Sequence, residues 1–419
     1  MIVCLFLYLI IAFLCSIDGG LKSTKNSFVL WIPIFFTYSF FVFISNCYID
    51  NPLRDYFITS DQIYFYTESL YLSNFDISEI FERSFTDALF SESPLAIFYF
   101  AVLSKFAKFL DVTDILLFQK LNVAFIASLI PLYVYKLAKF RFGRSKKQVK
   151  QVIAFSLLSP LLILSCQLLR DIHVCFIYTL SFYVLLNQKV NYRYIKFTIL
   201  VLFAFLFRIE SGLFLSTLIF VPLYGYYKRA SSVMRIITLI FTLTLVLLFF
   251  GYFYTAANET IQHYTLKSVE SASSGSLGVL LEKLPFPLNI LSKTIFAQLL
   301  PFPLWFPFQE GASYSYLRIV ECFFPFYWIA ILYLLFMNIK RIIKDGNSVM
   351  IISLMWAISF LLLCSASEFN TRRLLAVYPI IFFTYIYYKS IFHLRFSRGL
   401  IFSVPFLLLL HFAYILIKN

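Results

Sequence analysis

The sequence has few charged residues for its length. Asp, Glu, Lys and Arg make up 13% of its 419 residues, where about 25% is usual in a soluble protein. Apolar residues make up 61%, where about 45–50% is usual. A soluble fold could not cover so much apolar surface with so few charges. This imbalance excludes a cytosolic enzyme and a nucleic-acid-binding protein, and it predicts a polytopic membrane protein.

Glycine is scarce as well, with 11 residues, and there is no Gly-rich phosphate-binding motif. Neither a serine-nucleophile elbow nor a His-Glu-x-x-His motif is present. The seven cysteines form no Cys-x-x-Cys pair, and most of them lie within apolar runs. These absences argue against a disulfide framework and against a zinc site.

Long apolar runs are the main feature that the sequence does have. A membrane span needs about 20 apolar residues, and the runs predict an all-α integral membrane protein with about twelve transmembrane helices in one domain, residues 1–419. The first run lacks the basic start and the cleavage site of a signal peptide, so we expect it to be the first span. The expected spans are 1–17, 28–46, 116–138, 152–169, 172–188, 197–209, 211–227, 236–254, 319–339, 348–366, 374–388 and 399–417.

Basic residues concentrate in one set of the loops between these runs. That set holds 21 of the 35 Lys and Arg residues but only two acids, Asp18 and Asp345. Because cytoplasmic loops are rich in Lys and Arg, we expect these loops in the cytoplasm and both chain ends outside. The basic loops are 18–27, 136–150, 189–196, 228–235, 340–346 and 389–398.

This alternation leaves a long, acidic outer loop, residues 47–115. Within it, residues 77–89 place apolar side chains on one face and charges on the other, which predicts a helix lying in the membrane interface. Asp76 and Glu79 form an N-terminal capping pattern for this helix. We expect a second helix, 94–110, beside the membrane, because crossing the membrane there would invert every later loop.

A second outer loop, residues 255–318, begins polar and becomes Pro-rich. Two Pro-Phe-Pro-Leu sequences, at 285–288 and 301–304, flank a short helix-like piece. Because proline removes a backbone donor and breaks helices, this loop predicts a re-entrant or surface-lying element rather than a plain span.

Ionisable side chains near the outer ends of spans are the candidates for a site, because charge at membrane depth costs roughly 2.5–3.5 kcal/mol. The first candidates are Asp55 and Asp61, which follow the second span. A carboxylate there is suited to act as a general base on a hydroxyl or to hold a divalent cation. The alternative is a solvated acidic loop.

Two further groups lie in turns between spans. Arg170 and Asp171 occupy a tight turn with apolar flanks, where the alternative is a pair facing lipid headgroups. Arg208 and Glu210 lie in a hairpin with 31 residues between its flanking lysines, whereas two full spans need about 40. We therefore expect these two side chains below the membrane surface, in a polar cavity.

The last group is Arg372 and Arg373, just before the span 374–388. Paired arginines suit phosphate or pyrophosphate, because the guanidinium fork makes bidentate, charge-assisted hydrogen bonds. The alternative is anchoring on lipid phosphate. The four groups together predict an outward-facing cavity for a phosphate-bearing lipid substrate.

Several short motifs resemble those of the integral-membrane glycosyltransferases of the C-type fold (GT-C), and also those of bacterial O-antigen and capsule repeat-unit polymerases. The similarity runs over most of residues 50–390. The motifs are Asp61-Gln-Ile-Tyr64, Ser93-Pro-Leu95, Lys139-Phe-Arg-Phe-Gly-Arg144, Ser159-Pro160, Arg170-Asp171, Arg208, Asn370-Thr-Arg-Arg373 and Tyr378-Pro379.

The resemblance implies a transferase that takes saccharide from a polyprenyl (pyro)phosphate at the outer face of the bacterial inner membrane. It implies Asp61, or Asp55 as second choice, as catalytic base. It implies that arginines hold the lipid phosphate. Arg372 or Arg373 matches the arginine of the C-type family, and the polymerase group favours Arg170, Arg208, Arg372 and Arg373. The chain departs from the C-type pattern by an extra span before the acidic loop and by the lack of a separate C-terminal soluble domain.

We therefore expect a glycosyltransferase of surface-glycan synthesis, either a repeat-unit polymerase or a sugar transferase. Asp61 is the expected base, Arg208, Arg372 and Arg373 bind phosphate, and Arg170, Asp171 and Glu210 shape the acceptor site.

The expected partners are the polyprenyl-linked saccharide, the bilayer and a chain-length regulator, and no nucleic acid. A divalent cation is the one cofactor to consider. The alternative from another class is a lipid-linked oligosaccharide flippase, against which stand the lack of an inverted repeat and the charge bias toward the outer loops.

Overall fold

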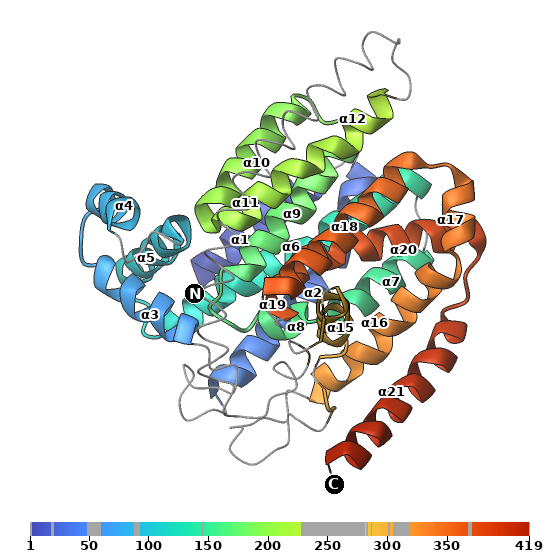
Figure 1. Cartoon of the computed structure of the whole chain (residues 1–419). Coiled ribbons are helices and arrows are strands. Elements are labelled where there is room, and N and C mark those ends of the chain that lie inside the picture. The colour runs from blue at the N-terminus through green and yellow to red at the C-terminus, as the bar shows by residue number, and fades with distance from the viewer. Residues whose placement is uncertain are drawn as a thin grey trace.

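A computed structural model describes residues 2–17, 21–47, 60–87, 93–143, 146–227, 281, 284–285, 287–300, 302–304, 319–367 and 371–418. Within these ranges the chain is helical and contains no strand (Figure 1). Six of the described helices are long and apolar enough to cross a membrane: Ser23–Asn46, Ile115–Phe142, Val320–Met337, Ser348–Ser365, Arg372–Phe392 and Phe396–Leu416. Together with the composition, they identify an α-helical membrane protein.

The first half of the structure contains α1 (Ile2–Ser16), α2 (Leu21–Cys47), α3 (Ser60–Leu72), α4 (Ile77–Thr86), α5 (Pro94–Phe109), α6 (Ile115–Phe142), α7 (Lys146–Leu157), α8 (Leu161–Leu164), α9 (Asp171–Leu186), α10 (Arg193–Phe207), α11 (Ile209–Ser216) and α12 (Phe220–Tyr227). The second half contains α15 (Leu288–Ala297), α16 (Ile319–Met337), α17 (Ile339–Asp345), α18 (Ser348–Ser367), α19 (Thr371–Leu374), α20 (Tyr378–Phe392) and α21 (Phe396–Lys418). Short 3₁₀ turns follow α11 and α19.

Helix α6 lies at the centre of the structure and packs against both α2 and α9. Polar side chains join it to its neighbours: Trp31 of α2 donates its indole N–H to Ser128 Oγ of α6, 2.7 Å away. Gln119 of α6 donates Nε2 to Ser69 Oγ of α3 and to Ser104 Oγ of α5, at 2.9 and 2.7 Å. The amide of Gln119 therefore holds α3, which carries Asp61, against the core.

Helix α21 lies at the edge of the structure, where it packs along α16 (Figure 1). Most of it is exposed, and its outward residues are large and apolar, with Ile401 at 72% and Leu409 at 68% exposure. A contiguous apolar surface of this kind is what a lipid-facing helix presents. Proline inside α2, α6, α16 and α21 agrees with this environment, since spanning helices tolerate it better than soluble ones.

The expected span 152–169 is interrupted by a stretch that is not helical. In place of 152–169 the structure has α7, which ends at Leu157, the single turn α8, and a non-helical stretch from Ser165 to Arg170. Pro160 lies at the break, where its missing N–H cannot continue the helix. The basic loop 136–150 is also shorter than expected, because α6 continues to Phe142 and α7 begins at Lys146. The expected span 236–254 lies outside the described residues.

The acidic outer loop contains the two expected helices, as α4 and α5. Its capping prediction is wrong: Asp76 makes no side-chain hydrogen bond to the start of α4, and Glu79 instead pairs with Arg83, 2.7 Å away. A full guanidinium charge four residues along the helix competes successfully for the Glu79 carboxylate. Helix α5 is held to the turn before α4 by Lys105, which donates to the Phe75 carbonyl at 2.6 Å. Whether α5 lies beside the membrane stays a prediction.

The short helix expected in the second outer loop is present as α15, between the two Pro-Phe-Pro-Leu sequences, and it packs against α18. Most of the remainder of 255–318 lies outside the described residues. The Leu304 N–H donates to His411 Nε2 of α21, 2.9 Å away, which ties the second Pro-Phe-Pro-Leu sequence to the last helix.

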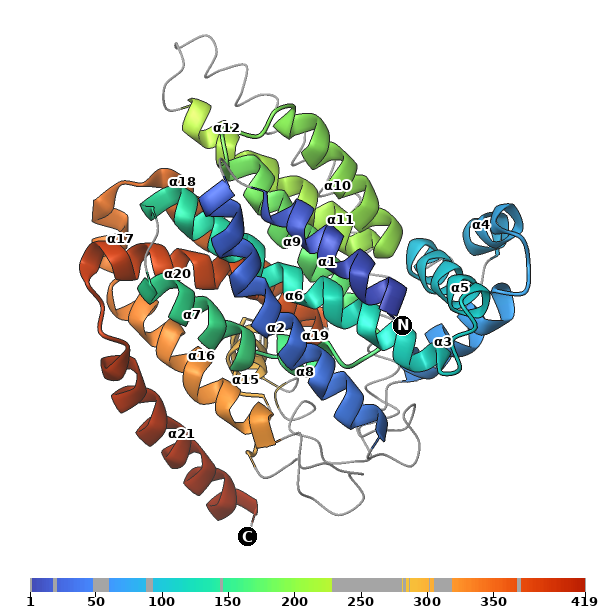
Figure 2. The same ribbon diagram turned by 180° about the vertical axis from the view of Figure 1, so that it is seen from behind.

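The basic helix termini gather at one end of the bundle, which we call the basic end and define by Arg141, Lys147, Arg193, Lys344 and Lys389. Arg141 of α6 and Arg193 of α10 line one cavity there, together with residues of α9, α18 and α20. Lys389 of α20 lies within electrostatic range of Lys147 of α7. Figure 2 shows α12 and α17 on one side of the molecule and α3 on the other.

Candidate functional site

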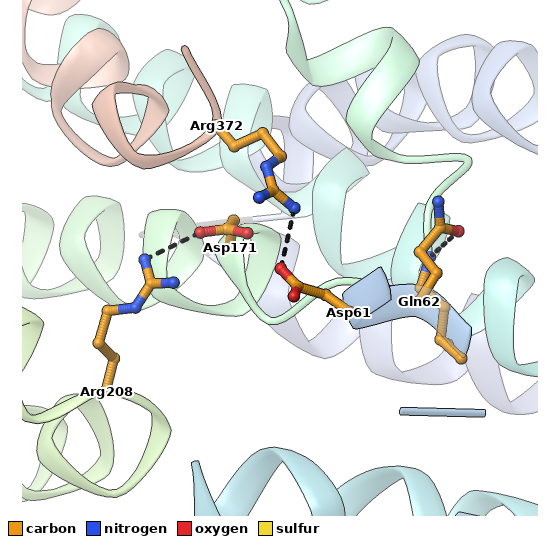
Figure 3. A network of polar contacts seen from close by, with 6 residues as sticks. Asp61, Gln62, Asp171, Arg208 and Arg372 are labelled. Carbon is orange, nitrogen blue, oxygen red and sulfur yellow. Dashed lines mark hydrogen bonds and ion pairs between the residues drawn. The ribbon is translucent and has the colours of Figure 1, made fainter. Parts of the chain in front are cut away.

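The site begins with an ion pair between two turns of the chain. Arg208 Nη1 lies 3.1 Å from Asp171 Oδ1, and the two side chains are only 10% and 6% exposed (Figure 3). Asp171 is the first residue of α9, and Arg208 is the single residue between α10 and α11. The sequence predicted a short hairpin here, and the structure places its turn at Arg208. This turn brings the Arg208 guanidinium to Asp171.

Local packing fixes this hairpin. The backbone of Arg208 is extended, its N–H donates to the Ala204 carbonyl, and its own carbonyl accepts from the Gly212 N–H at 3.1 Å. A Cβ at Gly212 would lie 2.6 Å from the Phe205 Cα, so only glycine allows α10 and α11 to approach this closely. Tyr178 of α9 donates its hydroxyl to the Ser211 carbonyl at 2.7 Å and holds α11 against the helix that carries Asp171.

A second ion pair lies beside the first. Arg372 Nη1 of α19 is 3.2 Å from Asp61 Oδ2, in the first turn of α3. Asp61 is half exposed and Arg372 is 19% exposed, so this pair lies at the mouth of the site while the Asp171 pair lies deeper. Residues 61 and 372 are far apart in the sequence, and the fold brings them together (Figure 3).

Asp171 is surrounded by positive charge. Arg208, Arg372, Arg170 and Arg373 all lie within electrostatic range of its carboxylate. The environment of Arg170 includes two carboxylates, Asp171 and Glu210, and both favour its charged form. Burial, reinforced by the positive charge of Arg208, lowers the pKa of Arg170 to about 10, so this guanidinium remains charged at neutral pH.

The structure thus brings together most of the residues that the sequence nominated: Asp61, Arg170, Asp171, Arg208, Glu210, Arg372 and Arg373. Glu210 is exposed and lies at the edge of the group rather than inside it. Asp55 lies outside the described residues. Four arginines against three carboxylates leave the group with a net positive charge, which suits an anionic ligand such as a phosphate.

Sequence reasoning missed Gln62. This side chain is fully buried, and its Oε1 accepts the Leu168 N–H at 3.1 Å, in the non-helical stretch just before Arg170 (Figure 3). It therefore fastens the start of α3 to the segment that carries Arg170 and Asp171. The sequence held a signal for it, because Gln62 shares the buried face of α3 with Phe65 and Ser69 at helical spacing, and a buried amide requires a partner.

Three or more His, Cys, Asp or Glu side chains do not gather into a metal-binding cluster anywhere in the part of the chain that the structure describes. Near the site, Asp61 and Asp171 each contact an arginine. No family model, curated protein or solved structure matches this chain. Function is therefore inferred from the residues of the site.

Proposed function

We propose that this chain is a glycosyltransferase of bacterial surface-glycan synthesis that acts on a polyprenyl-(pyro)phosphate-linked saccharide. In this proposal it has a twelve-span, GT-C-like arrangement in the inner membrane, and the site opens outward. The observation that carries the proposal is the convergence of Asp61 and Asp171 with four arginines at the end of the bundle opposite the basic end. Such a group suits a reaction in which a hydroxyl is deprotonated and a phosphate leaves.

Each residue would have a defined role in the transfer. Asp61 accepts the proton of the acceptor hydroxyl, whose oxygen then bonds to the anomeric carbon of the donor sugar. The bond from that carbon to the phosphate oxygen breaks, and Arg208, Arg372 and Arg373 stabilise the charge that remains on the phosphate. Arg170, Asp171 and Glu210 border the acceptor sugar.

The pairing of Arg372 with Asp61 gives this scheme an order of events. A phosphate at Arg372 competes with Asp61 for the same guanidinium, whose nitrogen is 3.2 Å from the carboxylate. Donor binding would therefore release the Asp61 carboxylate at the moment when an acceptor needs a base. The half-exposed position of Asp61 leaves it accessible to an acceptor that enters from the water phase.

The test is complementation of a gene deletion in the host, followed by gel analysis of the surface glycan. The variants are Asp61→Asn, Arg208→Ala and Arg372→Ala, at verified expression. Asp76→Asn and Arg83→Ala are matched controls, because these residues carry the same charges as the site residues and lie outside the site, in the outer loop that also holds Asp61. The proposal expects the site variants to fail and the controls to complement.

The form of the failure separates the two versions of the enzyme. If the gel shows a single capped repeat unit and the ladder of longer glycan chains is lost, the enzyme is a polymerase, which would work beside a chain-length regulator. A ladder that persists with one sugar missing identifies a monosaccharide transferase. A normal glycan in all three site variants contradicts the enzyme and favours the flippase.

A further inference from the structure

A cavity of about 230 Å³ lies at the basic end, away from the site described above. It is enclosed by the last turns of α6 and α9, the first turns of α10 and α18, and parts of α12 and α20. Its inner wall is apolar and includes Leu185, Val349 and Phe383. Its volume is below the range of about 300–1,000 Å³ that is usual for whole small-molecule ligands, so it fits a head group rather than an entire lipid.

Two arginines from different helices line this cavity. Arg141 comes from the end of α6, and Arg193 is the first residue of α10. Arg193 stacks on the Tyr194 ring, 4.7 Å from its centroid, and donates Nη2 to the Tyr194 hydroxyl at 2.8 Å. This contact orients the guanidinium and uses one of its five N–H donors, so others remain for a ligand.

The surroundings of the cavity favour an anion. None of the described residues that line it is acidic, and Gln188 adds a neutral hydrogen-bonding side chain. Lys189 lies between the lining residues Gln188 and Arg193, Lys196 follows them on α10, and Lys139 precedes Arg141 on α6. Two arginines on an apolar wall match a phosphate group attached to an apolar stem, because the guanidinium forks bind the phosphate oxygens while the wall accepts the stem.

We propose that this cavity binds a phosphate group, with Arg141 and Arg193 as its ligands. The group is either the head group of an anionic membrane lipid or a free phosphate compound, and the apolar wall favours the lipid. This site does not depend on the proposed transferase activity, since it lies at the opposite end of the bundle from Asp61 and Arg372. Bound lipid would join α6, α9, α10, α18 and α20 through one ligand.

The test measures binding to the full-length protein in detergent, by native mass spectrometry and by titrating the thermal unfolding midpoint. The ligands are dioctanoyl phosphatidylglycerol, dioctanoyl phosphatidylcholine and sodium phosphate. The variants are Arg141→Gln and Arg193→Gln, and Val349→Phe, which fills the inner wall. Lys340→Gln and Arg341→Gln are the matched controls, because both are exposed on α17 at the same end and outside the cavity.

We expect phosphatidylglycerol to bind more tightly than phosphatidylcholine. A hydrogen bond to a charged group contributes about 1.5–3 kcal/mol, so each cavity arginine variant should weaken binding about ten- to a hundredfold, and the controls should not. Binding of sodium phosphate with the same dependence on both arginines, and no advantage for the lipid, supports the phosphate site and assigns it to a free phosphate. Equal losses in cavity and control variants, or unchanged lipid binding in Val349→Phe, would overturn the proposal.

Discussion

Asp171 is the residue on which the candidate site depends most. Its carboxylate is almost fully buried and lies within electrostatic range of four arginines. Removing one partner of a buried ion pair costs about 3–5 kcal/mol when it leaves a buried charge without compensation. The two partners of the Asp171–Arg208 pair are not equivalent in this respect, because Asp171 retains three other arginines when Arg208 is lost.

This asymmetry predicts that Asp171→Asn destabilises the protein more than Arg208→Gln does. The first change leaves arginines facing one another, and the second leaves a carboxylate that is still surrounded by positive charge. The unfolding midpoint of purified protein, with and without pyrophosphate, measures the difference. Pyrophosphate should restore more stability to Asp171→Asn than to the unmodified protein, since it replaces the lost negative charge. Equal destabilisation by the two changes would contradict this account of the charges.

A second prediction at this scale concerns Arg372, whose geometry matters more than its charge in the proposed reaction. Arg372→Lys keeps a positive charge beside Asp61 but loses the bidentate fork. We expect the rate of saccharide transfer from a lipid-linked donor, measured in membranes, to fall about tenfold or more. This fall corresponds to the loss of one charged hydrogen bond. Stability should change by less than about 1 kcal/mol, because the Asp61 partner is half exposed. Arg83→Lys, in the exposed pair with Glu79, is the control and should leave transfer unchanged.

At the scale of elements, the close contact of α10 and α11 sets the position of Arg208. Gly212→Ala places a methyl group against Phe205 and must push the two helices apart. We expect a loss of roughly 1–3 kcal/mol in stability, as for other overpacked contacts, together with weaker phosphate binding. Gly399→Ala is the matched control: its Cβ would lie 2.7 Å from the Ala330 carbonyl oxygen, where α21 packs along α16. The control should lose stability but keep phosphate binding, and equal loss of binding in both would contradict the prediction.

Most helices other than α3 were predictable from the sequence, because apolar runs of the right length permit little else. The hairpin at Arg208 followed from length alone, and α15 followed from the prolines around it. The break between α7 and α9 was missed, although Pro160 marked it, because the apolar run continues through the break. The capping of α4 was also missed, because the sequence does not reveal whether Glu79 bonds the backbone or Arg83.

Contacts between distant segments were the least predictable part of the site. The sequence nominated Asp61 and Arg372 for separate reasons, and nothing in their spacing placed them 3.2 Å apart. Gln62 was not predicted, because the candidate site residues were chosen for their charge and an amide carries none. Its importance depends on the Leu168 N–H, which donates to it from a different segment of the chain.

The whole molecule is polarised. Basic helix termini occupy one end, and the paired carboxylates and arginines lie at the other. The positive-inside rule predicts which end meets the cytoplasm. In a variant without the natural cysteines, an impermeant maleimide applied to spheroplasts should label Thr86→Cys on α4. It should label Lys340→Cys on α17 only after permeabilisation. The reverse pattern would invert the molecule and place the site in the cytoplasm.

The shortness of α10 has a consequence for the bilayer itself. Its 15 residues extend about 22 Å, whereas the hydrocarbon layer is about 30 Å thick. Its outward face is apolar, with Ile195, Leu202 and Phe203 exposed. As an expected span, α10 would present a hydrophobic mismatch to the lipids beside it, and the bilayer would thin toward this face. The membrane surface would dip beside Arg208, so a lipid phosphate would reach the arginines without leaving the plane of its own leaflet.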